Sequence, residues 1–141
     1  MPQLATVVIL SIVAGILSLC AMAIIRGSGK KVVGYRPTWL TGLGACYLGY
    51  WISLVFGGIW GRFHPVVTAT DHFLHVFSIY GASFLIFALL HMGISLNGGG
   101  HKPRFRQSLF LGGVQAGTGL VWGVAAWYLG QAVKAARTAS L

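Results

Sequence analysis

The single acidic residue of the chain, Asp71, lies beside two histidines. The segment DHFLHV places it next to His72 and four residues before His75. In a helix, residues three or four positions apart lie on the same face. Imidazole and carboxylate groups in this arrangement are ligand types that bind copper or zinc, and His64 in the preceding segment would add another. The sequence therefore allows a metal site made of Asp71, His72 or His75, and His64.

A structural role for Asp71 is the competing interpretation. The residue lies where an apolar helix is predicted to begin, so Thr70 or Asp71 is expected to accept hydrogen bonds from the first unpaired backbone amides. The carboxylate also complements the positive end of the helix dipole and is placed to pair with Arg62 or His72. We expect capping and pairing, rather than metal ligation, to be its role.

A second polar site is predicted near the other end of the same segment. His91 follows His75 by 16 residues, which is about 24 Å of helix rise, so one small ligand cannot contact both. Gln115, in the next apolar stretch, is expected at a depth similar to that of His91. An ionisable residue inside a membrane segment is a candidate functional residue.

Three interpretations of His91 stay open. It can hydrogen bond to Gln115 or to a backbone carbonyl, it can ligate a haem iron or a chlorophyll magnesium, or it can border a quinone or lipid-headgroup pocket. The other apolar stretches contain no histidine. A six-coordinate haem b would therefore need its second ligand from a partner subunit, and the isolated chain is expected to carry none.

Four long apolar stretches carry these residues. They cover residues 4–25, 38–60, 72–96 and 108–132, and each is near or above the roughly 20 residues that a helix needs to cross a bilayer. Only 8% of the 141 residues are charged, whereas a soluble domain carries about a quarter. The sequence predicts an all-α integral membrane protein, with four transmembrane helices in a compact up-down bundle that forms a single domain over residues 1–141.

The basic residues predict the orientation of these helices. The net charge is +9, and seven of the ten Lys and Arg residues lie in the first and third connecting segments. The positive-inside rule makes these segments cytoplasmic and places both termini outside, in the inner membrane of a bacterium. Short basic segments beside apolar stretches are typical of contact with anionic lipids, and no nucleic-acid binding is expected. The seven residues are Arg26, Lys30, Lys31, Arg36, Lys102, Arg104 and Arg106.

Small residues recur at every fourth position of the second apolar stretch. They predict a shallow groove along which another helix packs closely. The fourth stretch carries glycines on more than one side, which favours a second neighbouring helix. The residues of the groove are Thr41, Ala45, Gly49, Ser53, Gly57 and Gly61.

The chain has no paired carboxylates, which argues against acid–base catalysis and against cation-coupled transport. The sequence favours a non-catalytic four-helix accessory or anchor subunit of a larger membrane complex, of the energy-converting (respiratory or photosynthetic) class. Such a subunit binds other membrane subunits and completes a haem, chlorophyll or quinone pocket at His91 and Gln115. The alternatives are a small oligomeric channel or transporter, and a membrane metalloprotein that uses the cluster around Asp71.

Overall fold

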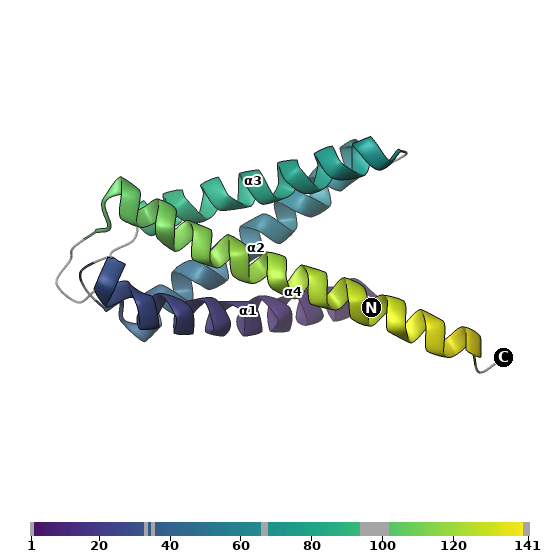
Figure 1. Cartoon of the computed structure of the whole chain (residues 1–141), viewed down its shortest axis with the longest axis horizontal. Coiled ribbons are helices and arrows are strands. Elements are labelled where there is room, and N and C mark those ends of the chain that lie inside the picture. The colour runs from purple at the N-terminus through teal and green to yellow at the C-terminus, as the bar shows by residue number, and fades with distance from the viewer. Residues whose placement is uncertain (1, 33, 35, 66–67, 94–101, 140–141) are drawn as a thin grey trace.

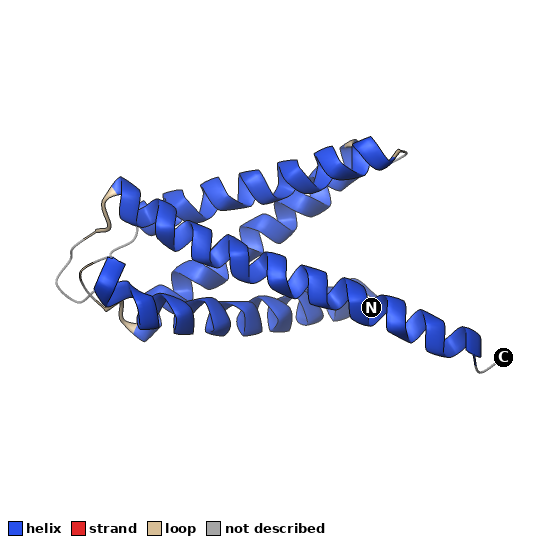
Figure 2. Cartoon of the chain, in the orientation of Figure 1, coloured by secondary structure: helices blue, strands red, loops and turns tan. Residues whose placement is uncertain are grey.

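In the residues that it describes, the computed structural model contains four α-helices (Figures 1 and 2). It describes residues 2–32, 34, 36–65, 68–93 and 102–139. Each helix is long and apolar enough to cross a membrane, so the predicted all-helical fold with four such helices is confirmed. The helices are α1 (Pro2–Val32), α2 (Trp39–Phe63), α3 (Ala69–Gly93) and α4 (Phe105–Ala139).

Two of the helices run past the apolar stretches that predicted them. α1 continues through Lys30 and Lys31, and α4 continues through Lys134 to Ala139. Lysine, arginine and alanine are good helix formers, so the helical backbone continues where the apolar run has ended. The 35 residues of α4 span about 52 Å. Residues 94–96, at the end of the third predicted stretch, lie outside the described residues.

The four helices form a ring of neighbours. α1 contacts α2 and α4, and α3 contacts α2 and α4. The helices converge at the end where α1 leads into α2 and α3 leads into α4, and they diverge towards the opposite end (Figure 1). Successive helices run in opposite directions, and the bundle is open at one end (Figure 1). The outer part of α4, residues 121–136, is exposed throughout.

The core lies in the half of the bundle where the helices converge, and all four helices contribute to it. Its buried residues are Ala14, Ala21, Met22, Ile25, Ala45, Cys46, Tyr50, Phe87 and Leu111. α3 and α4 approach closely at Gly112, where an added Cβ would lie 2.8 Å from the backbone nitrogen of Ala88.

The groove of small residues on α2 faces other helices of the same chain. An added Cβ at Gly49 would meet Phe87 of α3 and Gln115 of α4, and one at Gly57 would meet Ile79 of α3. This part of the groove therefore packs within the bundle. Thr41, at the end of the predicted groove, is exposed.

Candidate functional site

His91 of α3 and Gln115 of α4 meet in the core, where both side chains are completely buried. His91 Nε2 lies 3.0 Å from Gln115 Oε1. The amide nitrogen of Gln115 donates to the backbone carbonyl of Cys46 over 2.8 Å. Because Oε1 is then the acceptor that faces the imidazole, His91 donates from Nε2, and in the neutral ring Nδ1 then carries a lone pair.

Tyr50 extends this pair into a network across three helices. Its hydroxyl donates to the backbone carbonyl of Gln115 over 2.7 Å. Its ring packs edge-on against Phe87, with 5.3 Å between the ring centroids. Gln115 is thus bonded to α3 through its side-chain oxygen and to α2 through its side-chain nitrogen and its own carbonyl.

Glycine at position 49 leaves the space that this network occupies. An added Cβ would lie 2.7 Å from Gln115 Nε2 and 2.8 Å from Phe87 Cδ1. Both distances are shorter than van der Waals contact, so any side chain at this position would displace the amide or the ring. The small residue predicted to let helices approach also makes room for a buried amide.

Of the three interpretations of His91, the observed contact with Gln115 agrees with a hydrogen bond. The ring has no exposed surface, and ligation of a haem or chlorophyll metal through Nε2 would require the bond to Gln115 to break. His91 Nδ1 is buried and has no hydrogen-bond partner among the described residues. The hydrogen bond between the two side chains therefore links α3 to α4, and His91 Nδ1 is left as an acceptor without a donor among the described residues.

Asp71 forms a reciprocal cap with Thr68 at the beginning of α3. The backbone amide and the hydroxyl of Thr68 donate to Asp71 Oδ2 over 2.9 and 2.8 Å. In return, the Asp71 amide donates to Thr68 Oγ1 over 3.1 Å. Such a pair satisfies two amides that a helix start leaves without intrahelical partners. The prediction that Asp71 caps this helix is confirmed, but the N-cap residue is Thr68, since α3 begins before Thr70.

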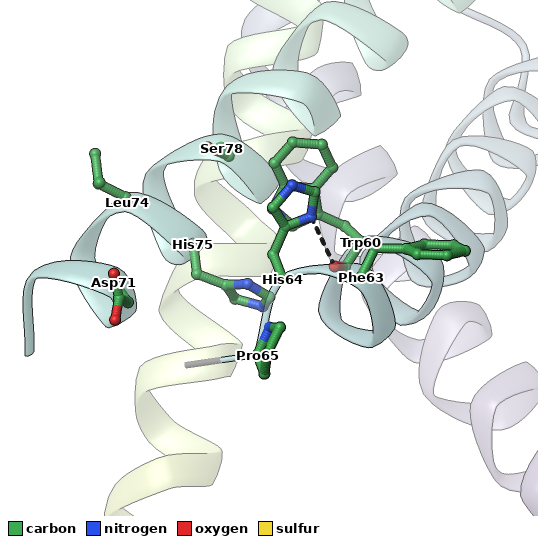
Figure 3. Close-up of a pocket in the computed structure, with 8 residues that line it drawn as sticks. All are labelled: Trp60, Phe63, His64, Pro65, Asp71, Leu74, His75 and Ser78. Atoms are coloured by element: carbon green, nitrogen blue, oxygen red, sulfur yellow. Dashed lines mark hydrogen bonds between the residues drawn. The ribbon is translucent and has the colours of Figure 1, made fainter. Parts of the chain in front are cut away.

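A cavity of about 320 Å³ lies between the end of α2 and the start of α3 (Figure 3). His64, Asp71 and His75 line it, together with Trp60 and other side chains. His72 is exposed and does not line this cavity. Residues from the end of α2 and the beginning of α3 therefore line one cavity, and His72 is not among them.

The two histidines of this cavity are held in different ways. His64 stacks on Trp60, with 3.9 Å between the ring centroids, and its Nδ1 lies 3.2 Å from the Trp60 carbonyl. His75 packs beside Gly61, where an added Cβ would lie 3.5 Å from its Cε1. In the described ranges, no three His, Cys, Asp or Glu side chains are grouped so that they could hold a metal ion.

Sequence reasoning paired His91 with Gln115 but missed Tyr50 and the carbonyl of Cys46. A tyrosine in an apolar helix needs a partner for its hydroxyl, and this signal was present for Tyr50. Its acceptor, however, lies 65 residues away in the chain, and no local pattern identifies it.

No protein-family model, curated protein or solved structure matches the chain. The fold and the site therefore define the class by themselves. It is a four-helix protein whose helices are long and apolar enough to cross a membrane. One neutral histidine–glutamine pair joins two of these helices in the core.

Proposed function

We propose that the chain is an integral membrane protein that serves as a non-catalytic subunit of a larger membrane complex. Large apolar side chains are exposed on all four helices. Water disfavours such a surface, whereas the hydrocarbon core of a bilayer does not. The buried polar side chains of the network are paired with one another or with backbone carbonyls, as an apolar solvent requires.

The outer part of α4 is the observation that carries the subunit proposal. It leaves the bundle (Figure 1), and Trp122, Trp127 and Leu129 on it are 46%, 60% and 67% exposed. An added Cβ at Gly130 would meet nothing within 4 Å. Small residues on an open helix face allow another helix to approach closely. We propose that a helix of a partner subunit packs here.

The orientation proposed from the basic residues is supported by where they lie. Arg26, Lys30 and Lys31 are on the last turns of α1, and Lys102 and Arg104 directly precede α4. These segments belong to the convergent end of the bundle (Figure 1). One end of the molecule thus carries a cationic surface suited to anionic headgroups on the cytoplasmic side.

A respiratory or photosynthetic complex is the finer proposal. Its support is the buried imidazole, whose Nδ1 keeps a free lone pair. The alternatives have less support: Asp71 is engaged in the cap, and the described residues contain no grouped metal-ligand set. A channel formed by several copies is an outcome that the experiment below can detect.

The experiment is purification of the tagged chain from its native membrane in a mild detergent. We expect defined subunits to co-migrate with it, and an absorption spectrum of the complex reports any pigment. Gly130→Leu should release these subunits because a bulky side chain blocks close helix approach. Val133→Leu, which replaces one bulky exposed side chain by another on the same part of α4, should retain them.

Two results would contradict the subunit proposal. One is a chain that migrates alone, or only as copies of itself, under conditions that keep other membrane complexes intact. The other is equal recovery of co-migrating subunits with Gly130→Leu and with Val133→Leu. Ion flux through vesicles that contain the purified chain alone would favour the channel alternative.

A further inference from the structure

A groove runs between α1 and α2 on the surface of the bundle, towards the convergent end. It encloses about 380 Å³, and no charged side chain lines it. Two of its lining residues are Gly15 of α1 and Gly44 of α2, and an added Cβ at either would meet nothing within 4 Å. Leu19 and Leu40, which also line it, are 53% and 84% exposed. The groove is therefore apolar and open to the surroundings of the chain.

Arg26 is held in place at the convergent end of this groove. Its Nη1 donates to the backbone carbonyl of Pro37 over 2.9 Å, and its guanidinium carbon lies 5.1 Å from the centre of the Trp39 ring. Trp39 directly precedes Leu40, which lines the groove. A guanidinium has five N–H donors, so the bond to Pro37 leaves others for a ligand. The groove thus ends beside a positioned cation.

The distance from the groove to the guanidinium matches one leaflet of a bilayer. Gly15, Leu19 and Arg26 share one face of α1, since intervals of four and seven residues return to nearly the same side of a helix. Arg26 follows Gly15 by 11 residues, which is about 16 Å of helix rise. The hydrocarbon core of a bilayer is about 30 Å thick, so one leaflet contributes about 15 Å. An acyl chain along this face would bring its headgroup level with Arg26.

Further cationic side chains lie close to Arg26. Lys30 is one turn further along α1, Arg36 directly precedes Pro37, and both are exposed. The one acidic residue of the chain, Asp71, is in the first turn of α3, at the opposite end of the bundle (Figure 1). The convergent end of the groove therefore complements a headgroup with a net negative charge. A zwitterionic headgroup is less favoured, because its own cation meets like charge.

We propose that the groove and Arg26 together bind one anionic phospholipid, with an acyl chain between α1 and α2 and the phosphate at the guanidinium. Arginine suits this role because its N–H donors match phosphate oxygens and its charge is permanent. A helix of a partner subunit is the less suitable occupant, since a membrane-spanning helix crosses both leaflets and the groove extends over about one. The inference rests on the proposed membrane location and assigns a defined site within the proposed cationic surface.

The test is native mass spectrometry of the full-length chain in detergent, with lipids added in a titration. The probes are phosphatidylglycerol and phosphatidylcholine with the same acyl chains, so that only the headgroup differs. We expect phosphatidylglycerol to bind about fivefold more tightly or better, which is the effect of one cationic side chain near an anionic headgroup. A phosphatidylglycerol with a photoreactive acyl chain should cross-link to residues 15–19 and 40–47.

Variants separate the headgroup site from the acyl-chain site. Arg26→Gln should weaken phosphatidylglycerol binding about fivefold, whereas Arg62→Gln removes the same charge at the open end and should have no effect. Gly44→Leu fills the groove and should suppress the cross-links. Gly58→Leu is its control, because an added Cβ there also meets nothing within 4 Å. Circular dichroism and gel filtration check folding, and Lys30→Gln, at an exposed position, replaces Arg26→Gln if the latter does not fold.

Equal affinities for the two lipids, or equal effects of Arg26→Gln and Arg62→Gln, would overturn the assignment, because the groove would then have no headgroup site. Cross-links that lie outside the groove, or that persist in Gly44→Leu, would overturn it as well. None of these results counts against the subunit proposal, which is scored by co-migrating partners in a separate preparation. Failure of the chain to sediment with membranes would instead remove the premise of both.

Discussion

His91 and Gln115 are hydrogen bonded to each other between α3 and α4, with 3.0 Å between Nε2 and Oε1. Both are completely buried, so neither can replace its partner with water. Nearby, the close approach of the helices at Gly112 and Ala88 places the two backbones in a defined register. A shift of one helix along the other would leave both polar side chains unpaired in the core.

The first prediction concerns the free energy of this pair. His91→Leu leaves Gln115 Oε1 without a donor, and Gln115→Leu leaves the His91 N–H without an acceptor. Each single variant should lower the free energy of unfolding in detergent by about 1–3 kcal/mol. The double variant should lose less than the sum of the two, because it leaves neither group unpaired. Strictly additive losses would show that the two side chains act independently.

A second prediction separates the hydrogen-bond interpretation from the pigment interpretation. Since Nε2 is engaged by Gln115, His91→Leu should leave the absorption spectrum and pigment content of the intact complex unchanged. The isolated chain should show no band of a six-coordinate haem. If His91→Leu instead removed a Soret or chlorophyll band while the complex stayed assembled, His91 would be a pigment ligand, shared with a partner or five-coordinate.

The third prediction compares two glycines of α2. Gly49→Ala would place a methyl group 2.7 Å from Gln115 Nε2, whereas an added Cβ at Gly58 meets nothing within 4 Å. Gly49→Ala should therefore destabilise the bundle by about 1–3 kcal/mol through overpacking. Gly58→Ala should be neutral or stabilise it by up to about 1 kcal/mol, because alanine favours the helix. Thermal unfolding of both variants in one detergent makes the comparison, and similar effects would contradict the observed packing.

The helices could be predicted from the sequence because each apolar stretch is long enough to be recognised without knowledge of its neighbours. The His91–Gln115 pair was also accessible, since depth in alternating membrane segments follows from counting residues. The bonds of Tyr50 and of the Cys46 carbonyl were not, because they depend on how α2 is rotated against α4. The divergence of α4 from the bundle could not be predicted either, because residues on this part of the helix would be apolar whether they faced protein or lipid.

The exact position of the cap of α3 was also beyond prediction from the sequence. Thr68 and Thr70 both precede or adjoin Asp71, and either side chain is suited to an N-cap. The choice depends on where the chain leaves the connection from α2 and adopts helical geometry. The local sequence predicted a cap at Thr70 or Asp71, whereas the capping threonine in the structure is Thr68.

The fourth prediction tests this cap against a metal-binding role for Asp71. Asp71→Ala removes the acceptor for both Thr68 donors and should cost about 0.5–2 kcal/mol of stability. Asp71→Asn keeps a side-chain oxygen and should cost less. Neither change should alter the copper or zinc content of the purified protein. Loss of a stoichiometric metal in Asp71→Asn would show that the carboxylate is a ligand and that capping is secondary.

The last prediction concerns orientation, and two exposed phenylalanines make it testable without altering the charge balance. Phe63 ends α2 at the open end of the bundle and is 74% exposed, whereas Phe105 begins α4 at the convergent, basic end and is 63% exposed. Cysteine is introduced at one position at a time, in a background that carries Cys20→Ala and Cys46→Ala. In intact cells, an impermeant maleimide should label the cysteine at position 63 and not that at position 105, because the basic end is held in the cytoplasm. Both should react after lysis, which controls for accessibility. Labelling at position 105 alone in intact cells would show the opposite orientation, with the cavity that His64, Asp71 and His75 line on the cytoplasmic side.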